Sequence, residues 1–169
     1  DKAHYFKGLE VLIKAFSLAE IGDTELVISG EGELEEYYKK LDRENKVVFS
    51  GRLSFEKLKE AYQRADVLVL PSINSNEAFG IVLIEAMASK TTVIASNLPG
   101  VRSVFEDNIS GLTAEINNVR DLKEKIEKII NNDDLRKEME ENAYQLFLRK
   151  YEEEIVKEKI LKNIKLIWK

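Results

Sequence analysis

Two carboxylates flank a glycine in the segment Asn76–Glu85, which reads N-E-A-F-G-I-V-L-I-E. Glu77 precedes Gly80, and Glu85 lies inside the apolar run Ile81–Ala88, which predicts a helix. A glycine at a helix start exposes backbone N–H groups, and the helix dipole favours an anion there. A carboxylate within an apolar helix is costly to bury unless a partner donates to it. The segment therefore predicts phosphate at the helix start and hydroxyl groups beside both carboxylates, a combination that a nucleotide diphosphate sugar carries.

The bulk composition describes one globular domain. The chain has 169 residues, of which 44% are hydrophobic and 34% charged, enough for a packed core. The net charge of −5 gives no reason to expect nucleic-acid binding. The sequence has no cysteine, which excludes disulfides, and no apolar run long enough to span a bilayer or to form a signal peptide. We expect a cytoplasmic protein.

Strands and helices alternate along the chain, which predicts an α/β fold. Helices of about 10–15 residues between strands imply right-handed crossovers and a parallel sheet. We expect a Rossmann-like three-layer α/β/α domain over residues 1–169. Ligands of such sheets bind at the carboxyl ends of strands, which here lead into Gly30, Gly51 and the loop Ser72–Gly80. The predicted strands are Glu25–Ser29, Lys46–Ser50, Asp66–Leu70, Thr92–Ala95 and Gly111–Ala114, and the main helices are Gly8–Glu20, Leu34–Leu41, Ser54–Arg64, Ile81–Ala88 and Val119–Ile130.

Separate predictions follow for the first residues and for the last residues of the chain. Asp1–Lys7 reads as a loop leading into a helix, whereas a doubly wound sheet normally opens on a strand. We therefore expect a fragment that begins just after the first strand of its domain. The segment Leu135–Trp168 predicts two charged helices with a break near Lys150 and Tyr151.

Seven stretches together resemble a known family in order and spacing. The chain resembles the C-terminal donor-binding domain of family 4 retaining glycosyltransferases, which have the two-domain glycosyltransferase B fold. An E-x7-E spacing alone is a weak signal, but the set covers nearly the whole chain. The stretches are Asp1–Gly8 (D-K-A-H-Y-F-K-G), Ser29–Gly32 (S-G-E-G), Phe49–Arg52 (F-S-G-R), Leu70–Ser72 (L-P-S), Glu77–Glu85, Ala95–Gly100 (A-S-N-L-P-G) and Ser110–Leu112 (S-G-L).

The resemblance implies two catalytic residues, Lys7 and Glu77. Lys7 matches the lysine that neutralises the donor diphosphate, and Glu77 matches the first acid of the motif, which contacts hydroxyls of the transferred sugar. Glu85 matches the second acid, which holds the ribose hydroxyls, and a carboxylate can accept from both members of a cis-diol. The simpler alternatives are a solvent-exposed loop acid for Glu77 and a carboxylate satisfied by the backbone or a lysine for Glu85.

The other implied donor contacts run through the backbone. Gly30 matches the turn that lets the backbone approach the donor, although an ordinary strand-to-helix turn explains it equally well. Arg52 and Leu53 match positions that border the base. The remaining implied contacts come from backbone amides at Phe79, Gly80 and Ile81. The single histidine, His4, lies in the loop before Lys7 and has a capping or phosphate-facing role as alternatives.

The implied reaction transfers a sugar to an acceptor hydroxyl with retention, without a cofactor or a metal. The sequence has no Asp-x-Asp to bridge a metal and a diphosphate. In the family the acceptor, a glycan or a lipid, binds an N-terminal domain that lies outside this chain, so we expect little turnover from the chain alone. The terminal helix, residues 151–169, would cross to that domain. Its apolar residues would favour self-association when exposed; they are Ile155, Ile160, Ile164 and Ile167.

Several alternatives stay open at this point. The donor base can be guanine, uracil or adenine, as in GDP-, UDP- or ADP-sugars. The parent enzyme can act in the cytoplasm or on the inner membrane face. A glycogen or starch synthase-like transferase shares the fold and a similar acid spacing. A non-catalytic nucleotide-binding domain would keep the sheet without needing Lys7, Glu77 and Glu85 together, and a receiver or flavodoxin-like module fits the long loop Ser72–Gly80 poorly.

Overall fold

The computed structural model describes Tyr5 and residues 7–167, with the side chains of Ile160 and of residues 162–167 left aside. Strands and helices alternate as the sequence predicts, and most bounds agree within two residues. His4, for which a capping or a phosphate-facing role was predicted, lies outside the described residues. The elements are α1 Leu9–Leu18, β1 Leu26–Ser29, α2 Glu35–Lys39, β2 Val47–Gly51, α3 Phe55–Arg64, β3 Val67–Leu70, α4 Ile81–Ala88, β4 Thr92–Ser96, the short 3₁₀ helix η2 Val101–Ser103, β5 Leu112–Ala114, α5 Val119–Ile130, α6 Asp133–Lys150 and α7 Glu153–Ile167.

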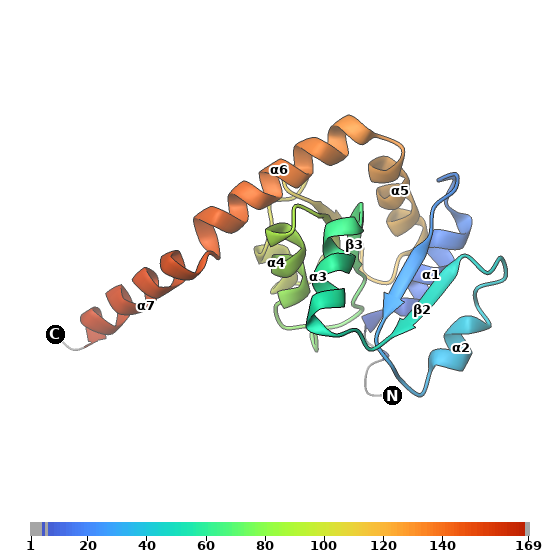
Figure 1. The fold of residues 1–169 in the computed structure, drawn as a ribbon, viewed down its shortest axis with the longest axis horizontal. Helices are drawn as coiled ribbons and strands as arrows, with labels where there is room; N and C mark the ends of the chain where they lie inside the picture. The colour runs from blue at the N-terminus through green and yellow to red at the C-terminus, as the bar shows by residue number, and fades with distance from the viewer. Residues whose placement is uncertain (1–4, 6, 168–169) are drawn as a thin grey trace.

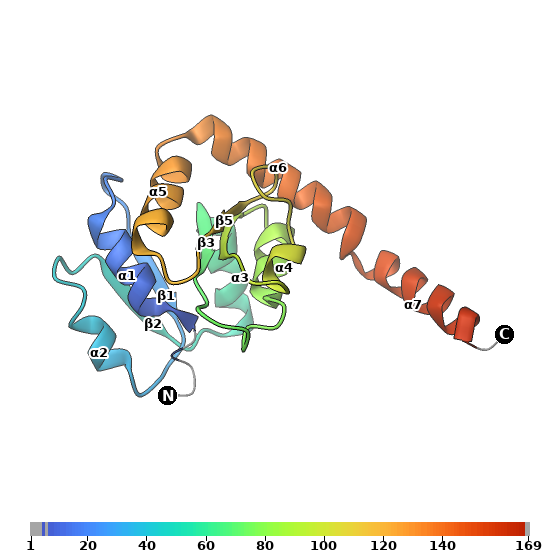
Figure 2. The same cartoon turned by 180° about the vertical axis from the view of Figure 1, so that it is seen from behind.

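All the strand pairings are parallel, as predicted, but the described strands form two sheets. β1 pairs with β2, and β4 lies between β3 and β5 in a second sheet. Helices cover both faces (Figures 1 and 2). The fold class is therefore the expected layered α/β class, but β1 and β2 form one sheet, and β3, β4 and β5 form another.

β4 shows how the sequence builds the layers. All five of its residues are buried. Val93 and Ala95 belong to a core with α3, α4 and α6, whereas Ile94, between them, belongs to a core with α1 and α5. Successive side chains of a strand point to opposite faces, so an unbroken apolar strand needs a helical layer on each side.

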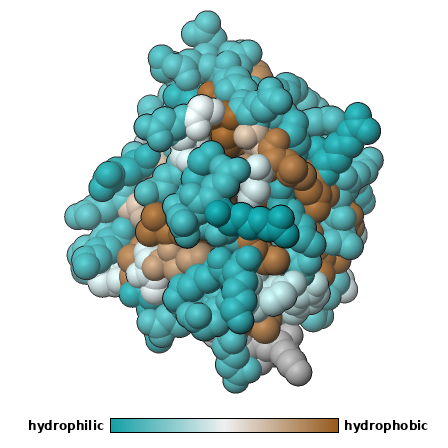
Figure 3. All heavy atoms as spheres, turned by 90° about the vertical axis from the view of Figure 1, so that its right-hand side faces the viewer, coloured by the Kyte–Doolittle hydropathy of each residue, from teal (hydrophilic) through white to brown (hydrophobic). Residues whose placement is uncertain are grey.

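The β1–β2 sheet is covered less completely. Ile28 of β1 packs into a smaller core with Ile13 and Tyr38, which come from α1 and α2. Its neighbour Val27 is paired in register with Val48, and both side chains are about half exposed. The side of the molecule that carries β2 and α2 is mostly hydrophilic, with narrow apolar stretches (Figure 3).

Only the last of the described helices leaves the body of the domain. α6 packs along α4 and ends at Lys150, with Tyr151 as its C-cap, and α7 continues outward from it (Figures 1 and 2). The predicted break near Lys150 and Tyr151 is confirmed. Of the four apolar residues named for this helix, Ile155 is half-buried, and the side chains of Ile160, Ile164 and Ile167 lie outside the described ones. Two other apolar residues of α7, Val156 and Leu161, are exposed, and self-association through the helix stays a prediction.

Candidate functional site

The predicted site residues follow the carboxyl ends of β1, β2 and β3, along the lower edge in Figure 1. α1 starts beside the end of β3 and runs away from this edge, and β1 returns to it. The same edge therefore collects the loop after β1 at Gly30, the loop after β2 at Arg52 and the long loop Ser72–Gly80. This is the end of a parallel sheet at which ligands bind.

Lys7, Glu77 and Ser72 form one hydrogen-bonded group at this edge. Lys7 Nζ lies 2.6 Å from Glu77 Oε2, and Ser72 Oγ donates to the same oxygen at 3.2 Å. Ser72 is fully buried, and the side chains of Glu77 and Lys7 are 11% and 41% exposed. A buried serine and a partly exposed lysine thus hold a largely shielded carboxylate. The sequence assigned Lys7 and Glu77 to one site, and the structure brings them into direct contact.

Gly8 explains how the lysine reaches that carboxylate. Gly8 begins α1 in the left-handed conformation, with φ 71°, and a Cβ there would lie 2.0 Å from the carbonyl oxygen of Pro71. Only a residue without a side chain lets α1 start so close to the end of β3. This approach places Lys7 beside the loop that carries Glu77, and the helix start has no side-chain cap.

Gly80 gives α4 a similar start. It is buried, has φ 80°, and begins the helix without a side-chain cap, which confirms the predicted glycine at this helix start. Ile81 is exposed, and the Phe79 ring, 41% exposed, meets the ring of Tyr151 edge to face at 6.4 Å. Two helix N-termini, both favourable for an anion, therefore lie next to the group of Lys7 and Glu77.

Glu85 differs from its sequence expectation. The expected buried carboxylate is exposed, because Glu85 lies one turn after Ile81 on the outward face of α4, and Leu83, Ala86 and Met87 fill the inward face.

A partner that the sequence did not indicate holds this carboxylate. The hydroxyl of Tyr62 on α3 donates to Glu85 Oε2 at 2.7 Å. Tyr62 is 9% exposed. Burial, then the hydrogen bond to Glu85, raises the pKa of Tyr62 far above its usual value, so the phenol stays a protonated donor.

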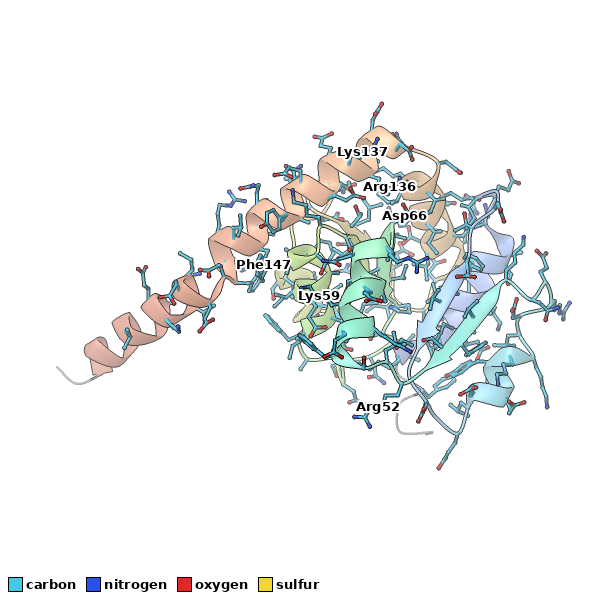
Figure 4. The ribbon with its side chains drawn as sticks, viewed as in Figure 1. Arg52, Lys59, Asp66, Arg136, Lys137 and Phe147 are labelled. Carbon is cyan, nitrogen blue, oxygen red and sulfur yellow. The ribbon has the colours of Figure 1, made fainter. Side chains whose placement is uncertain are left out.

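The loops after β1 and β2 are fastened to each other. Gly30, with φ 129°, donates its N–H to the carbonyl of Gly51 at 2.9 Å, and the Arg52 N–H lies 3.4 Å from Glu31 Oε1. The Arg52 side chain points outward from the loop between β2 and α3 (Figure 4), and Leu53 is half-buried. The structure thus places Gly30 and Arg52 on the same edge as Glu77 but in a separate hydrogen-bonded loop pair.

Gly100, which the sequence analysis named only as the end of the stretch Ala95–Gly100, supports the site. Its backbone is ordinary, with φ −69° and ψ −45°, yet a Cβ would lie 1.8 Å from the carbonyl oxygen of Ala78. Ala78 stands between Glu77 and Phe79, so Gly100 lets the loop before η2 pack against the loop that presents them. In the sequence, the Pro99-Gly100 pair does not reveal that Gly100 lies against the backbone of Ala78.

The site is an open edge of the domain. A hollow of about 230 Å³ borders this edge at Gly8 and Ile73, and another of about 420 Å³ lies further along α1 at Lys14 and Leu18. Neither is lined by Glu77 or Glu85. Among the described residues, no three His, Asp or Glu side chains group as metal ligands, and no helix is long and apolar enough to cross a membrane.

Comparisons with known proteins agree with this arrangement. The sequence profile of the family "Glycosyl transferases group 1" matches residues 2–146. An uncharacterised glycosyltransferase of Methanocaldococcus jannaschii is 39% identical over 145 residues, which cover 81% of this chain and 38% of that protein. The chain thus spans well under half the length of this relative.

Solved structures show the same fold. A glycosyltransferase from Rickettsia africae superposes with a TM-score of 0.84 at 29% identity, covering 97% of this chain and 45% of that one. The Anabaena protein HepE, solved in complex with UDP-glucose, has a TM-score of 0.83 at 21% identity, covering 95% and 45%. The family match over most of the chain, together with this fold, shows that the chain belongs to the group 1 glycosyltransferase family.

Proposed function

We propose that this chain is the donor-binding domain of a glycosyltransferase and holds a nucleotide diphosphate sugar at the edge formed by Lys7, Glu77 and Glu85. The observation that carries the proposal is the Lys7–Glu77–Ser72 group beside two uncapped helix N-termini. A cation and two sets of helix amides suit a diphosphate. A shielded carboxylate suits the hydroxyl groups of a sugar, and a second carboxylate, Glu85, suits those of a ribose.

The ion pair between Lys7 and Glu77 gives the site a defined first step. The carboxylate offsets the lysine charge, so an arriving diphosphate must draw Lys7 away from Glu77 Oε2. Glu77 keeps the hydrogen bond from Ser72 and becomes able to accept from the sugar. The lysine and the helix amides then stabilise the charge that grows on the departing diphosphate, as preorganised donors do in other group transfers, and Glu77 orients the sugar.

The activity of the whole protein follows as part of the same proposal. We expect it to transfer a hexosyl group with retention to an acceptor hydroxyl of a glycan or lipid bound by a second domain. The UDP-glucose complex of HepE, a protein of the same fold, supports a nucleotide sugar as the donor class. GDP, UDP and ADP remain the candidate carriers, and a cytoplasmic location stays a prediction.

Calorimetric titration with GDP, UDP, ADP and their sugar conjugates tests the donor site. We expect one nucleotide to bind selectively and Lys7→Met to weaken it about tenfold or more, the loss of one charge-assisted contact to phosphate. Lys123→Met is the matched control, because Lys123 lies 2.8 Å from the carboxylate of Glu127 on α5, and Glu127 accepts from the N–H of Glu20, beyond the far end of α1. If both lysine variants lost the same amount of nucleotide affinity, the proposal would be contradicted. It would also be contradicted if Glu85→Ala left the nucleotide affinity unchanged.

A further inference from the structure

The contact between Tyr62 and Glu85 joins a buried side chain to an exposed one. Tyr62 belongs to the core that α3, α4 and β4 share, and its backbone carbonyl accepts a hydrogen bond from Thr91 Oγ1 at 2.7 Å. Its hydroxyl donates to Glu85 Oε2 at 2.7 Å. Both ends of this tyrosine are therefore fixed, while the carboxylate that it reaches lies on the outward face of α4.

The directions of the two helices explain the geometry. α3 and α4 each begin at the ligand-binding edge and run away from it, and Tyr62 lies near the far end of α3. Helical side chains lean toward the helix N-terminus, so the Tyr62 ring extends toward the edge and reaches Glu85 from the side that lies away from the edge. The side of Glu85 that faces the edge is left to other partners: no hydrogen bond to its Oε1 occurs within the described residues.

We propose that Tyr62 is a positioning residue that holds Oε2 of Glu85, so that Oε1 stays turned to the edge and accepts from the ribose hydroxyls of the donor. The inference rests on the proposed function for the role of Glu85, but the positioning itself is a property of the unliganded protein. An exposed glutamate normally samples several rotamers and loses that freedom on binding. A glutamate already held by a buried phenol has less freedom left to lose, which strengthens ribose binding.

The positioning is tested without any ligand. In wild-type protein we expect the β-proton couplings of Glu85, measured by NMR, to report one dominant χ1 rotamer. In Tyr62→Phe we expect averaged couplings, since the ring remains but the donor is gone. Unchanged couplings in Tyr62→Phe would overturn the proposal whatever the protein binds.

The consequence for binding is tested with ribose and 2′,3′-dideoxyribose forms of the nucleoside diphosphate that the titration selects. We expect Tyr62→Phe to weaken the ribose form about tenfold, the effect of losing one hydrogen bond to a charged group, and to change the dideoxy form less than twofold. If Tyr62 were purely structural, Tyr62→Phe would weaken the binding of both forms equally, and that result would overturn the proposal.

Thr91→Val is the matched control for loosened packing. It removes a buried hydrogen bond to the Tyr62 carbonyl but leaves the phenol, so we expect it to lower stability without changing the ratio of ribose to dideoxy affinity. Failure of the proposed function has a separate signature, because wild type would then bind both forms alike and Glu85→Ala would change neither.

Discussion

Replacing Gly100 with alanine tests the close approach that supports the loop Ser72–Gly80. The Gly100 backbone is helical, so local propensity alone predicts a neutral or slightly favourable change. The tertiary structure predicts the opposite. The new Cβ would lie 1.8 Å from the carbonyl oxygen of Ala78, whereas real Cβ contacts stay at 3.0 Å or more. The two backbones must therefore separate by at least about 1 Å.

The size of the effect follows from that displacement. Overpacking of this kind costs about 2 kcal/mol, which lowers the melting temperature of a domain of this size by roughly 4–8 °C. Ala78 adjoins Glu77, so a similar shift is enough to break the 3.2 Å hydrogen bond from Ser72. We expect Gly100→Ala to lose donor affinity as well as stability.

Thermal unfolding followed by circular dichroism, with titration of the selected nucleotide sugar, measures both effects. Gly22→Ala is the control: Gly22 has φ 61°, and a Cβ there meets nothing within 4 Å. Gly22→Ala should therefore lower stability by about 1 kcal/mol, from the unfavourable backbone conformation alone, and should leave nucleotide sugar binding unchanged. A Gly100→Ala protein as stable as wild type, or one destabilised no more than Gly22→Ala with donor affinity intact, would refute the reasoning.

Four further outcomes follow from the described contacts. Glu77→Gln should weaken nucleotide sugar binding about tenfold yet leave the nucleoside diphosphate bound at least as tightly in calorimetry, because the carboxylate that competes for Lys7 is then neutral. Equal losses of affinity for the nucleotide sugar and for the nucleoside diphosphate would contradict the proposed transfer of Lys7 from Glu77 to the diphosphate. Lys90 has φ 60° just after α4 and pairs with Glu141, so in urea unfolding Lys90→Gly should be about 1 kcal/mol more stable than Lys90→Ala, and equal stabilities would exclude backbone strain there. Burial raises the pKa of Glu140, so its ionisation weakens the fold as pH rises, and Glu140→Gln should gain stability relative to wild type between about pH 4 and pH 7. Hydrogen bonds, first from Gln145 and then from Lys90, lower the pKa of Glu141 below its ordinary 4.5, so wild type should gain stability over Glu141→Gln as the pH rises toward 4.5 and keep that gain at higher pH. Melting curves in which both variants change with pH in the same direction relative to wild type would contradict these assignments.

The sequence by itself determined the order of the elements and was enough to name the residues of the candidate site. Helix and strand periods are local properties, so α4 and α5 have the predicted bounds, and the break at Tyr151 lies where the pattern changes. Glycines and carboxylates at strand ends pointed to one edge of a parallel fold, because the carboxyl ends of parallel strands meet there. Lys7 and Glu77, seventy residues apart, were assigned to one site through their motifs, and the structure joins them.

Only the tertiary structure decided which atoms meet. The partner of Glu85 is a tyrosine on another helix, and the face of α4 that turns outward depends on how α4 packs on β4 and α6. Gly100 matters through the backbone of Ala78, a contact between two loops with no local signature. The division of the strands into two sheets likewise depends on pairing between distant segments. Local sequence fixes periods and turn types, whereas contacts across the chain arise from packing that many sequences satisfy in different ways.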